Sequence, residues 1–130
     1  MKAEQLVELA IKSKERAYVP YSNFRVGAAL LTKVGKVYTG CNIENASFGA
    51  TNCAERTAIF KAISEGDREF VAIAINSDSE HIIFPCGICR QVMMEFSKDL
   101  VVYVSNKHGK YEEFTLEQLL PGGFTNEDMK

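Results

Sequence analysis

The feature that most restricts the fold of this chain is an almost unbroken apolar run at residues 70–76, Phe-Val-Ala-Ile-Ala-Ile-Asn. The run is far shorter than the roughly 20 apolar residues that span a bilayer, so no membrane segment is expected. A strand that is apolar on both faces belongs inside a sheet that other elements cover on both sides. The chain is therefore expected to fold in layers around a central sheet.

The spacing of apolar residues predicts the elements that surround this strand. It predicts helices at residues 4–18, 53–64 and 85–96, and a helical turn at 115–120. It also predicts extended segments at residues 24–32, 36–42, 100–104 and 111–114, the first two joined by a hairpin around Gly35. The resulting order, α-β-β-α-β-α-β-β-α, predicts a three-layer α/β/α fold with a mixed five-stranded sheet covered by helices on both faces.

Length and charge narrow the class of protein further. The 130 residues contain no repeat, linker or low-complexity tract, so we expect a single domain over residues 1–130. The net charge is −2, and the lysines and arginines are scattered rather than clustered. A nucleic-acid partner is not expected, because binding a phosphate backbone requires a concentrated basic surface.

The N-terminus and the cysteines indicate a reducing compartment. Glu4 and Glu8 fall where a secretory signal would need an unbroken apolar stretch, so we expect a cytoplasmic protein. Cysteines in such a compartment are metal ligands, nucleophiles or buried thiols more often than disulfides. Their spacing must decide between these roles.

Three of the four cysteines have the spacing of a catalytic zinc site. Cys86 and Cys89 are three residues apart in an expected helix, which places both sulfurs on one side. Cys53 begins another expected helix and supplies a third thiolate. Three protein ligands leave one tetrahedral position open, as in catalytic rather than structural zinc sites. The sequence thus predicts one Zn²⁺ per chain.

The residues beside these cysteines have two readings each. Glu55 follows Cys53 by two, so it should lie beside the ion, where a carboxylate could move protons as a general acid and base. Alone, it could equally be a solvated acid in a helical first turn. Arg56 and Arg90 could donate hydrogen bonds to the sulfurs and draw off their negative charge, or be surface charges. The helix starts beneath Cys53 and Cys86 should draw off charge in the same way.

The remaining cysteine and the histidines are not expected to bind metal. Strand alternation places Cys41 on the face opposite Asn42 and Glu44, so a buried structural thiol is predicted. His81 and His108 lie in polar stretches and are interpreted as surface residues.

The motif Cys53-Ala54-Glu55 is followed by Pro85-Cys86-Gly87-Ile88-Cys89, with thirty-two residues between Cys53 and Cys86, and this combination resembles the signature of the zinc nucleobase deaminases. The match to the short, homotetrameric cytidine deaminases covers most of residues 1–124. It includes these further stretches: Pro20-Tyr21-Ser22, Phe24, Val26-Gly27-Ala28-Ala29-Leu30, Gly40-Cys41-Asn42-Ile43-Glu44-Asn45-Ala46, Arg56-Thr57-Ala58 and Arg90-Gln91-Val92.

The resemblance implies an enzyme of pyrimidine salvage that hydrolyses cytidine and 2′-deoxycytidine to the uridine counterparts and releases ammonia. It implies that zinc-activated hydroxide attacks C4 of the cytosine while Glu55 shuttles the protons. It also implies a nucleoside substrate site in a homotetramer whose active sites are shared between subunits. The implied contacts are Phe24 packing on the nucleoside, Asn42 and Glu44 binding the sugar hydroxyls, the Ala54 backbone holding the pyrimidine edge, and Phe124 entering the site of a neighbouring subunit.

Two departures from the family pattern and two rival functions stay open. Ile88 stands where small residues are frequent and is expected to pack away from the metal, while Ser47-Phe48-Gly49 replaces a stretch that often carries Tyr and bears on subunit contacts. A deaminase of nucleoside antibiotics or of other nucleobases would share the metal site. A non-catalytic zinc-binding module would use the three cysteines as a scaffold.

Overall fold

The structure is a computed structural model that describes residues 1–129. It contains one five-stranded sheet with the spatial order β2-β1-β3-β4-β5. The strands are β1 (Val26–Thr32), β2 (Val37–Cys41), β3 (Phe70–Ser77), β4 (Val101–Ser105) and β5 (Tyr111–Thr115). Strands β3 and β4 are parallel and the other neighbours are antiparallel. The mixed five-stranded sheet is as the sequence predicts.

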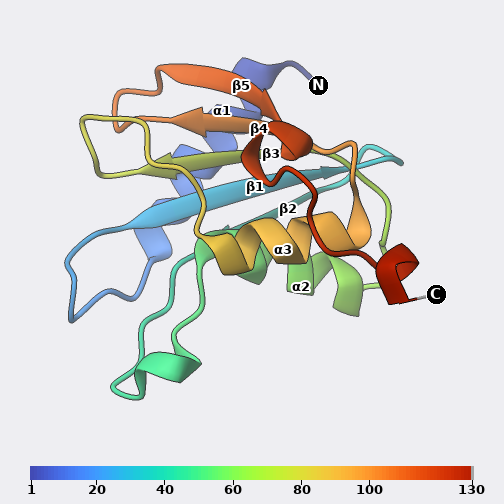
Figure 1. The fold of residues 1–130 in the computed structure, drawn as a ribbon. Helices are drawn as coiled ribbons and strands as arrows, with labels where there is room; N and C mark the ends of the chain where they lie inside the picture. Colours follow the sequence, from blue (N-terminus) through green and yellow to red (C-terminus); the bar gives the residue numbers. More distant parts are fainter. Residues whose placement is uncertain (130) are drawn as a thin grey trace.

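Helices cover both faces of this sheet (Figure 1). Helix α1 (Ala3–Ser13) lies behind the sheet in this view, and α2 (Ala54–Ser64) and α3 (Gly87–Phe96) lie in front of it. The shorter helical pieces are η1 (Lys14–Arg16), η2 (Phe48–Ala50), α4 (Leu116–Leu119) and η3 (Asn126–Met129). Within residues 1–129, none of the helices combines the length and apolar character that a bilayer crossing requires.

The apolar strand β3 holds the two hydrophobic layers together. Ala72 and Ala74 pack on the side of α1, whereas Ile73 and Ile75 belong to the larger core under α2 and α3. The predicted burial of this strand on both faces is confirmed. It explains why the run is apolar at successive positions rather than at alternate ones.

A glycine sets how closely helix α2 approaches the sheet. A Cβ atom on Gly40 of β2 would lie 2.6 Å from both Ala54 O and Ala58 N. Only a residue without a side chain allows this contact. Gly40 therefore fixes the position of the first turn of α2, where Cys53 and Glu55 are found.

Three boundaries differ from the sequence prediction by two residues or more. The first helix was expected to reach residue 18, but α1 ends at Ser13 and a 3₁₀ turn continues to Arg16. The third helix was expected from residue 85, but α3 begins at Gly87. The first strand was expected from residue 24, but β1 begins at Val26. The backbone ahead of Val26 is bonded to side chains of neighbouring segments, which no local pattern reveals.

Candidate metal centre and its cavity

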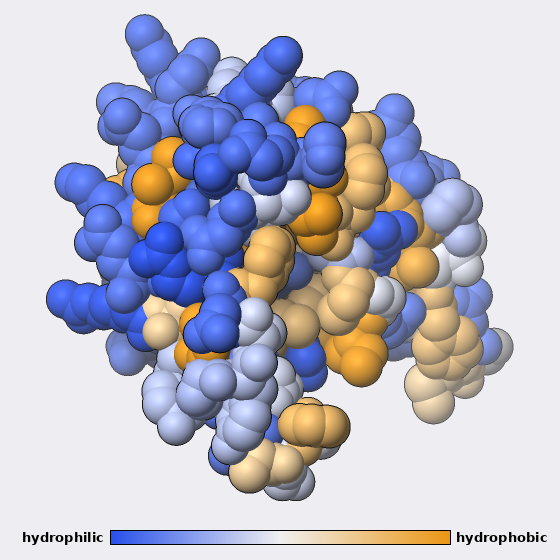
Figure 2. All heavy atoms as spheres, turned by 90° about the vertical axis from the view of Figure 1, so that its left-hand side faces the viewer, coloured by the Kyte–Doolittle hydropathy of each residue, from blue (hydrophilic) through white to orange (hydrophobic). Residues whose placement is uncertain are grey.

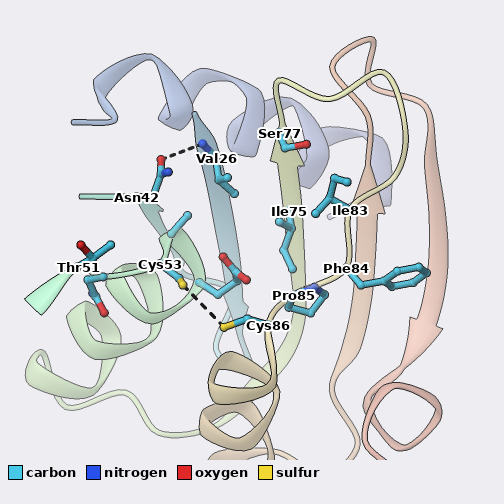
Figure 3. A pocket seen from close by; sticks show the side chains of 13 residues that line it. Val26, Asn42, Thr51, Cys53, Ile75, Ser77, Ile83, Phe84, Pro85 and Cys86 are labelled. Carbon is cyan, nitrogen blue, oxygen red and sulfur yellow. Dashed lines mark hydrogen bonds between the residues drawn. The ribbon is translucent and has the colours of Figure 1, made fainter. Parts of the chain in front are cut away.

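The three predicted ligand cysteines converge on one point. Cys53 immediately precedes α2 and Cys86 immediately precedes α3, while Cys89 lies in the first turn of α3. Their sulfur atoms all lie within 4.8 Å of one another, and Cys53 Sγ and Cys86 Sγ are 3.9 Å apart. Figure 3 shows these two sulfurs facing each other between the two helix starts. Residues 33 positions apart in the chain are thus brought together by the fold.

This arrangement fits a zinc ion. Zinc–thiolate bonds of about 2.3 Å in a tetrahedron place neighbouring sulfurs about 3.8 Å apart. The sulfurs are close to that separation already, and they come from exposed, partly buried and buried residues, so one side of the cluster is open. The donor set and the open side suit an ion that also binds water.

Arg56 contacts this cluster directly. Its Nη2 atom donates to Cys53 Sγ at 3.3 Å. Hydrogen bonding from the Cys89 thiol lowers the pKa of Cys53 to about 5, opposed by burial and assisted by Arg56. The hydrogen bond to Cys53, together with burial, acts the other way on Cys89 and raises its pKa. Cys53 is therefore the first of the two to lose its proton.

Arg90 serves the backbone around the site instead of the sulfurs. Its Nε donates to Pro85 O at 2.7 Å and its Nη1 to Leu119 O at 2.6 Å. The expectation that Arg90 bonds to the sulfurs is wrong, because its guanidinium points back toward the residue before Cys86 and toward α4. It holds the start of α3 in place.

Glu55 is buried beside the cluster, with only 4% of its surface exposed. Burial raises the pKa of its carboxyl to about 7, with a further contribution from the charge of Cys53. The reading of Glu55 as a solvated first-turn acid is excluded by this burial. A carboxyl with a pKa near 7 can both accept and release a proton at neutral pH.

Glu55, Cys53 and Cys86 are among the residues that line a cavity of about 190 Å³. The walls come from the segment before α3, from the ends of β1 and β3, and from the segment before α2: Val26, Asn42, Thr51, Asn52, Cys53, Ala54, Glu55, Ile75, Ser77, Ile83, Phe84, Pro85 and Cys86. Figure 2 shows this end of the molecule, where hydrophobic side chains surround a central hollow beneath a more hydrophilic surface. The cavity can take a flat, mostly apolar group with its polar edge toward Glu55.

The predicted sugar-binding pair lies at the rim. Asn42 lines the cavity, and its Nδ2 donates to Phe24 O while its Oδ1 accepts from Val26 N, both at 2.9 Å. Glu44 lines an adjoining hollow that shares Thr51 with the first. Its carboxylate accepts from the Ser22 hydroxyl and from the backbone N–H groups of Tyr21 and Ser22. The Ser22 hydroxyl is the main cause that lowers the pKa of Glu44, so this carboxylate is ionised.

The two predicted aromatic contacts lie outside the cavity wall of residues 1–129. Phe24 is half-buried next to Asn42, and Phe124 is 57% exposed. The Phe124 carbonyl accepts from Gln91 Nε2 at 2.6 Å, which ties the C-terminal segment to α3. An exposed Phe124 ring agrees with the idea that something outside this chain covers it.

Two packing expectations need correction. Cys41 stands apart from the metal cluster, as expected, but its thiol is only half-buried because β2 is an edge strand. Ile88, expected to pack, is 62% exposed in the first turn of α3, where no other element of residues 1–129 covers it. His81 and His108 are exposed, as expected.

Several wall residues have no signal in the sequence. Ser77 and Ile75 end a strand whose pattern indicates only burial, and Ile83 and Phe84 precede the Pro-Cys motif in a loop. The position of Ile83 and Phe84 directly before Pro85 was the one available hint. The meeting of these segments depends on the parallel pairing of β3 with β4.

Comparisons with known proteins agree with this geometry. The family model for the cytidine and deoxycytidylate deaminase zinc-binding region matches residues 1–105. A cytidine deaminase from Halalkalibacterium halodurans is 57% identical over 130 residues, covering 99% of this chain and 98% of its own. A cytidine deaminase from Sporosarcina psychrophila is 52% identical over 130 residues, covering 99% and 96%.

A solved structure shares the fold as well. The crystal structure of cytidine deaminase from Burkholderia pseudomallei superimposes with a TM-score of 0.92 at 50% sequence identity. The match covers 95% of this chain and 100% of that one.

Proposed function

The chain belongs to the cytidine and deoxycytidylate deaminase zinc-binding family, and on that basis we propose that it hydrolyses cytidine and 2′-deoxycytidine. Water replaces the exocyclic amino group at C4 of the cytosine, giving uridine or 2′-deoxyuridine and ammonia. The observation that carries the proposal is the buried Glu55 carboxyl beside the three-sulfur cluster, with a pKa of about 7.

In this proposal Cys53, Cys86 and Cys89 hold the zinc ion, which supplies Lewis-acid activation of water. Glu55 accepts a proton from the attacking water and returns it to the nitrogen that leaves as ammonia. General acid and base catalysis by one positioned group typically contributes about 10²- to 10⁴-fold. Arg56 draws negative charge from Cys53 through its 3.3 Å contact, which offsets the charge of three thiolates.

The substrate lies along the cavity from the sulfurs to the rim. The Ala54 backbone faces the pyrimidine edge, while Asn42 and Glu44 bind the sugar hydroxyls. Phe24 packs on the nucleoside from beside Asn42. The exposed Phe124 enters the site of a neighbouring subunit, and the working form is a homotetramer with shared sites.

We assign this activity to pyrimidine salvage in the cytoplasm, with residues 1–130 acting as a single domain. The rival functions make different predictions. A non-catalytic zinc module does not require a buried acid in a cavity beside the ion. A deaminase of another nucleobase or of a nucleoside antibiotic would turn over its own substrate in preference to cytidine.

One assay tests the proposal. Purified protein is incubated with cytidine, with or without a chelator, and the loss of cytosine absorbance is followed together with ammonia release. We expect turnover that the chelator abolishes and added zinc restores. Absence of turnover by the zinc-loaded protein would exclude the proposed activity.

A further inference from the structure

The backbone of residues 24–26, which forms one rim of the cavity, is held almost entirely by two residues, Asn42 and Asp78, through both their side chains and their backbone. Asn42 bonds Phe24 O and Val26 N, and its own backbone N–H bonds Val26 O. Asp78 Oδ2 accepts from Arg25 N at 2.9 Å, and Asp78 N donates to Arg25 O at 3.1 Å. These contacts satisfy five of the six backbone polar groups of this segment, and Ser22 Oγ accepts from the sixth, Phe24 N.

The Asp78 carboxylate collects donors from two parts of the chain, Arg25 and Lys14. Besides the Arg25 backbone, it accepts from Arg25 Nε and Nη2, both at 3.0 Å, in a two-pronged pair. Lys14 Nζ, at the end of α1, lies 3.3 Å from Asp78 Oδ1 and also donates to Ser77 O. Against the cost of partial burial, the bonds from Arg25 and Lys14 lower the pKa of Asp78 to about 2. The carboxylate is thus ionised whenever the protein is folded at ordinary pH.

The network and the cavity lie on opposite faces of the same two strand ends. Val26 of β1 pairs with Ser77 of β3, and both line the cavity. Arg25 directly precedes β1 and Asp78 directly follows β3, and their side chains meet Lys14, which comes from the α1 side of the sheet. Arg25 and Asp78 touch none of the cavity, yet they fix the backbone from which its wall projects.

We propose that Asp78, with Arg25 and Lys14, is a positioning residue for the sugar end of the substrate site. It holds residues 24–26 in the one arrangement in which Phe24, Val26 and the Asn42 amide face the nucleoside. This rests on the proposed function. The metal cluster and Glu55 stand on α2 and α3, away from the network, so the chemical step should be largely independent of it.

The test compares two ion pairs on the same two strands. Asp78→Asn breaks the two-pronged pair at the cavity end. Glu69→Gln breaks the Lys33–Glu69 pair (3.4 Å, both side chains 73% exposed) at the opposite end, where Lys33 follows β1 and Glu69 precedes β3. We expect Asp78→Asn to raise KM for cytidine roughly 10-fold and to change kcat by less than about 3-fold, with zinc retained. Glu69→Gln should match the wild type in both constants.

A double-mutant cycle separates positioning from general destabilisation. If Asp78 acts through the segment that Asn42 also holds, the KM effects of Asp78→Asn and Asn42→Ala should be clearly less than multiplicative in the double variant. The proposal would be overturned if the two KM effects were fully multiplicative, or if Asp78→Asn left KM unchanged. It would also be overturned if Asp78→Asn and Glu69→Gln impaired kcat and KM to the same extent. Should Asp78→Asn not fold, Arg25→Gln, which leaves Lys14 paired with Asp78, is judged by the same criteria.

A substrate-free measurement keeps this proposal distinct from the proposed function. Hydrogen exchange of the Arg25 and Val26 amides should be roughly 10-fold faster in Asp78→Asn than in Glu69→Gln. Equal exchange rates in the two variants would refute the positioning role of Asp78 even if the enzyme is active. If the wild type were inactive but exchange were still faster in Asp78→Asn, the proposed activity would be refuted, whereas the positioning role of Asp78 would be supported.

Discussion

Arg56 Nη2 donates to Cys53 Sγ across 3.3 Å, from the first turn of α2 to the residue that caps it. The spacing of three places a guanidinium over the sulfur at the positive end of the helix. The hydrogen bond from Cys89, assisted by this contact with Arg56, lowers the pKa of Cys53 and prepares it as a thiolate, the form that binds metal. Cys41 differs from Cys53 in this respect, because burial raises the pKa of its thiol and favours the protonated form.

The first prediction follows from that contrast. Cys53→Ala should lose its zinc, whereas Cys41→Ala should keep about one zinc per chain, because Cys41 lies outside the sulfur cluster. Metal content of the dialysed proteins, measured by elemental analysis, provides the comparison. Zinc loss from Cys41→Ala with retention in Cys53→Ala would reverse the ligand assignment.

Replacing Glu55 by Gln should separate metal binding from turnover. The amide keeps the size of the buried side chain but cannot carry a proton, so we expect kcat to fall by at least roughly 10²-fold. Zinc content should stay unchanged, because Glu55 is not a ligand of the sulfur cluster. Steady-state kinetics with metal analysis checks both points, and near-normal kcat would remove Glu55 from the chemistry.

Glu44 should make the site selective against a 3′-phosphate. Its ionised carboxylate is fixed by Ser22 and Tyr21 at the place assigned to the sugar, and it repels a second negative group. We expect kcat/KM for 3′-CMP to be at least about 10-fold below that for cytidine. Comparable use of both substrates contradicts the sugar assignment, and the variant Glu44→Gln serves as the control that lacks the charge.

Gly40→Ala should destabilise the fold at the metal centre. The new methyl group would lie 2.6 Å from Ala54 O and Ala58 N and push α2 off the sheet. Overpacking of this kind costs about 1–3 kcal/mol of unfolding free energy. Gly49→Ala, where nothing lies within 4 Å of the new Cβ, is the matched control. Urea unfolding of zinc-loaded proteins measures the difference, and equal midpoints would show that the contact relaxes freely.

Phe124 should act in a neighbouring subunit. Chains inactivated by Glu55→Gln and chains inactivated by Phe124→Ala should regain some activity when co-assembled, since a mixed pair can combine one intact Glu55 with the other chain's intact Phe124. Activity is compared with that of each parent after proven subunit exchange. Full activity of Phe124→Ala alone, or no gain on mixing, means that the ring folds back on its own chain or is not needed.

Much of this architecture was predictable because it depends on local spacing. The apolar run at residues 70–76 required a covered central strand, and Cys86 with Cys89 required a shared helix side. The contact between Arg56 and Cys53 follows from the same helical geometry. Each of these relations joins residues that are near in sequence or that follow one helical or strand periodicity.

The contacts that the sequence did not predict join residues that only the assembled sheet brings together. Lys14, Arg25 and Asp78 come from three segments with no common pattern, and nothing in the sequence marks Asp78 as different from other acids after strands. Arg90 was misassigned because its neighbour Cys89 suggested a sulfur contact, whereas the carbonyl of Leu119 arrives from α4, 29 residues later.

The placement of Cys53 and Cys86 at the heads of two helices also affects how the chain unfolds. An ion shared by their sulfurs closes the intervening 33-residue separation into a ring that contains α2 and β3. Such a cross-link removes extended conformations from the unfolded chain, so the bound metal stabilises the folded state relative to the unfolded one. Resistance to unfolding and catalytic competence are therefore supplied by the same three sulfur atoms.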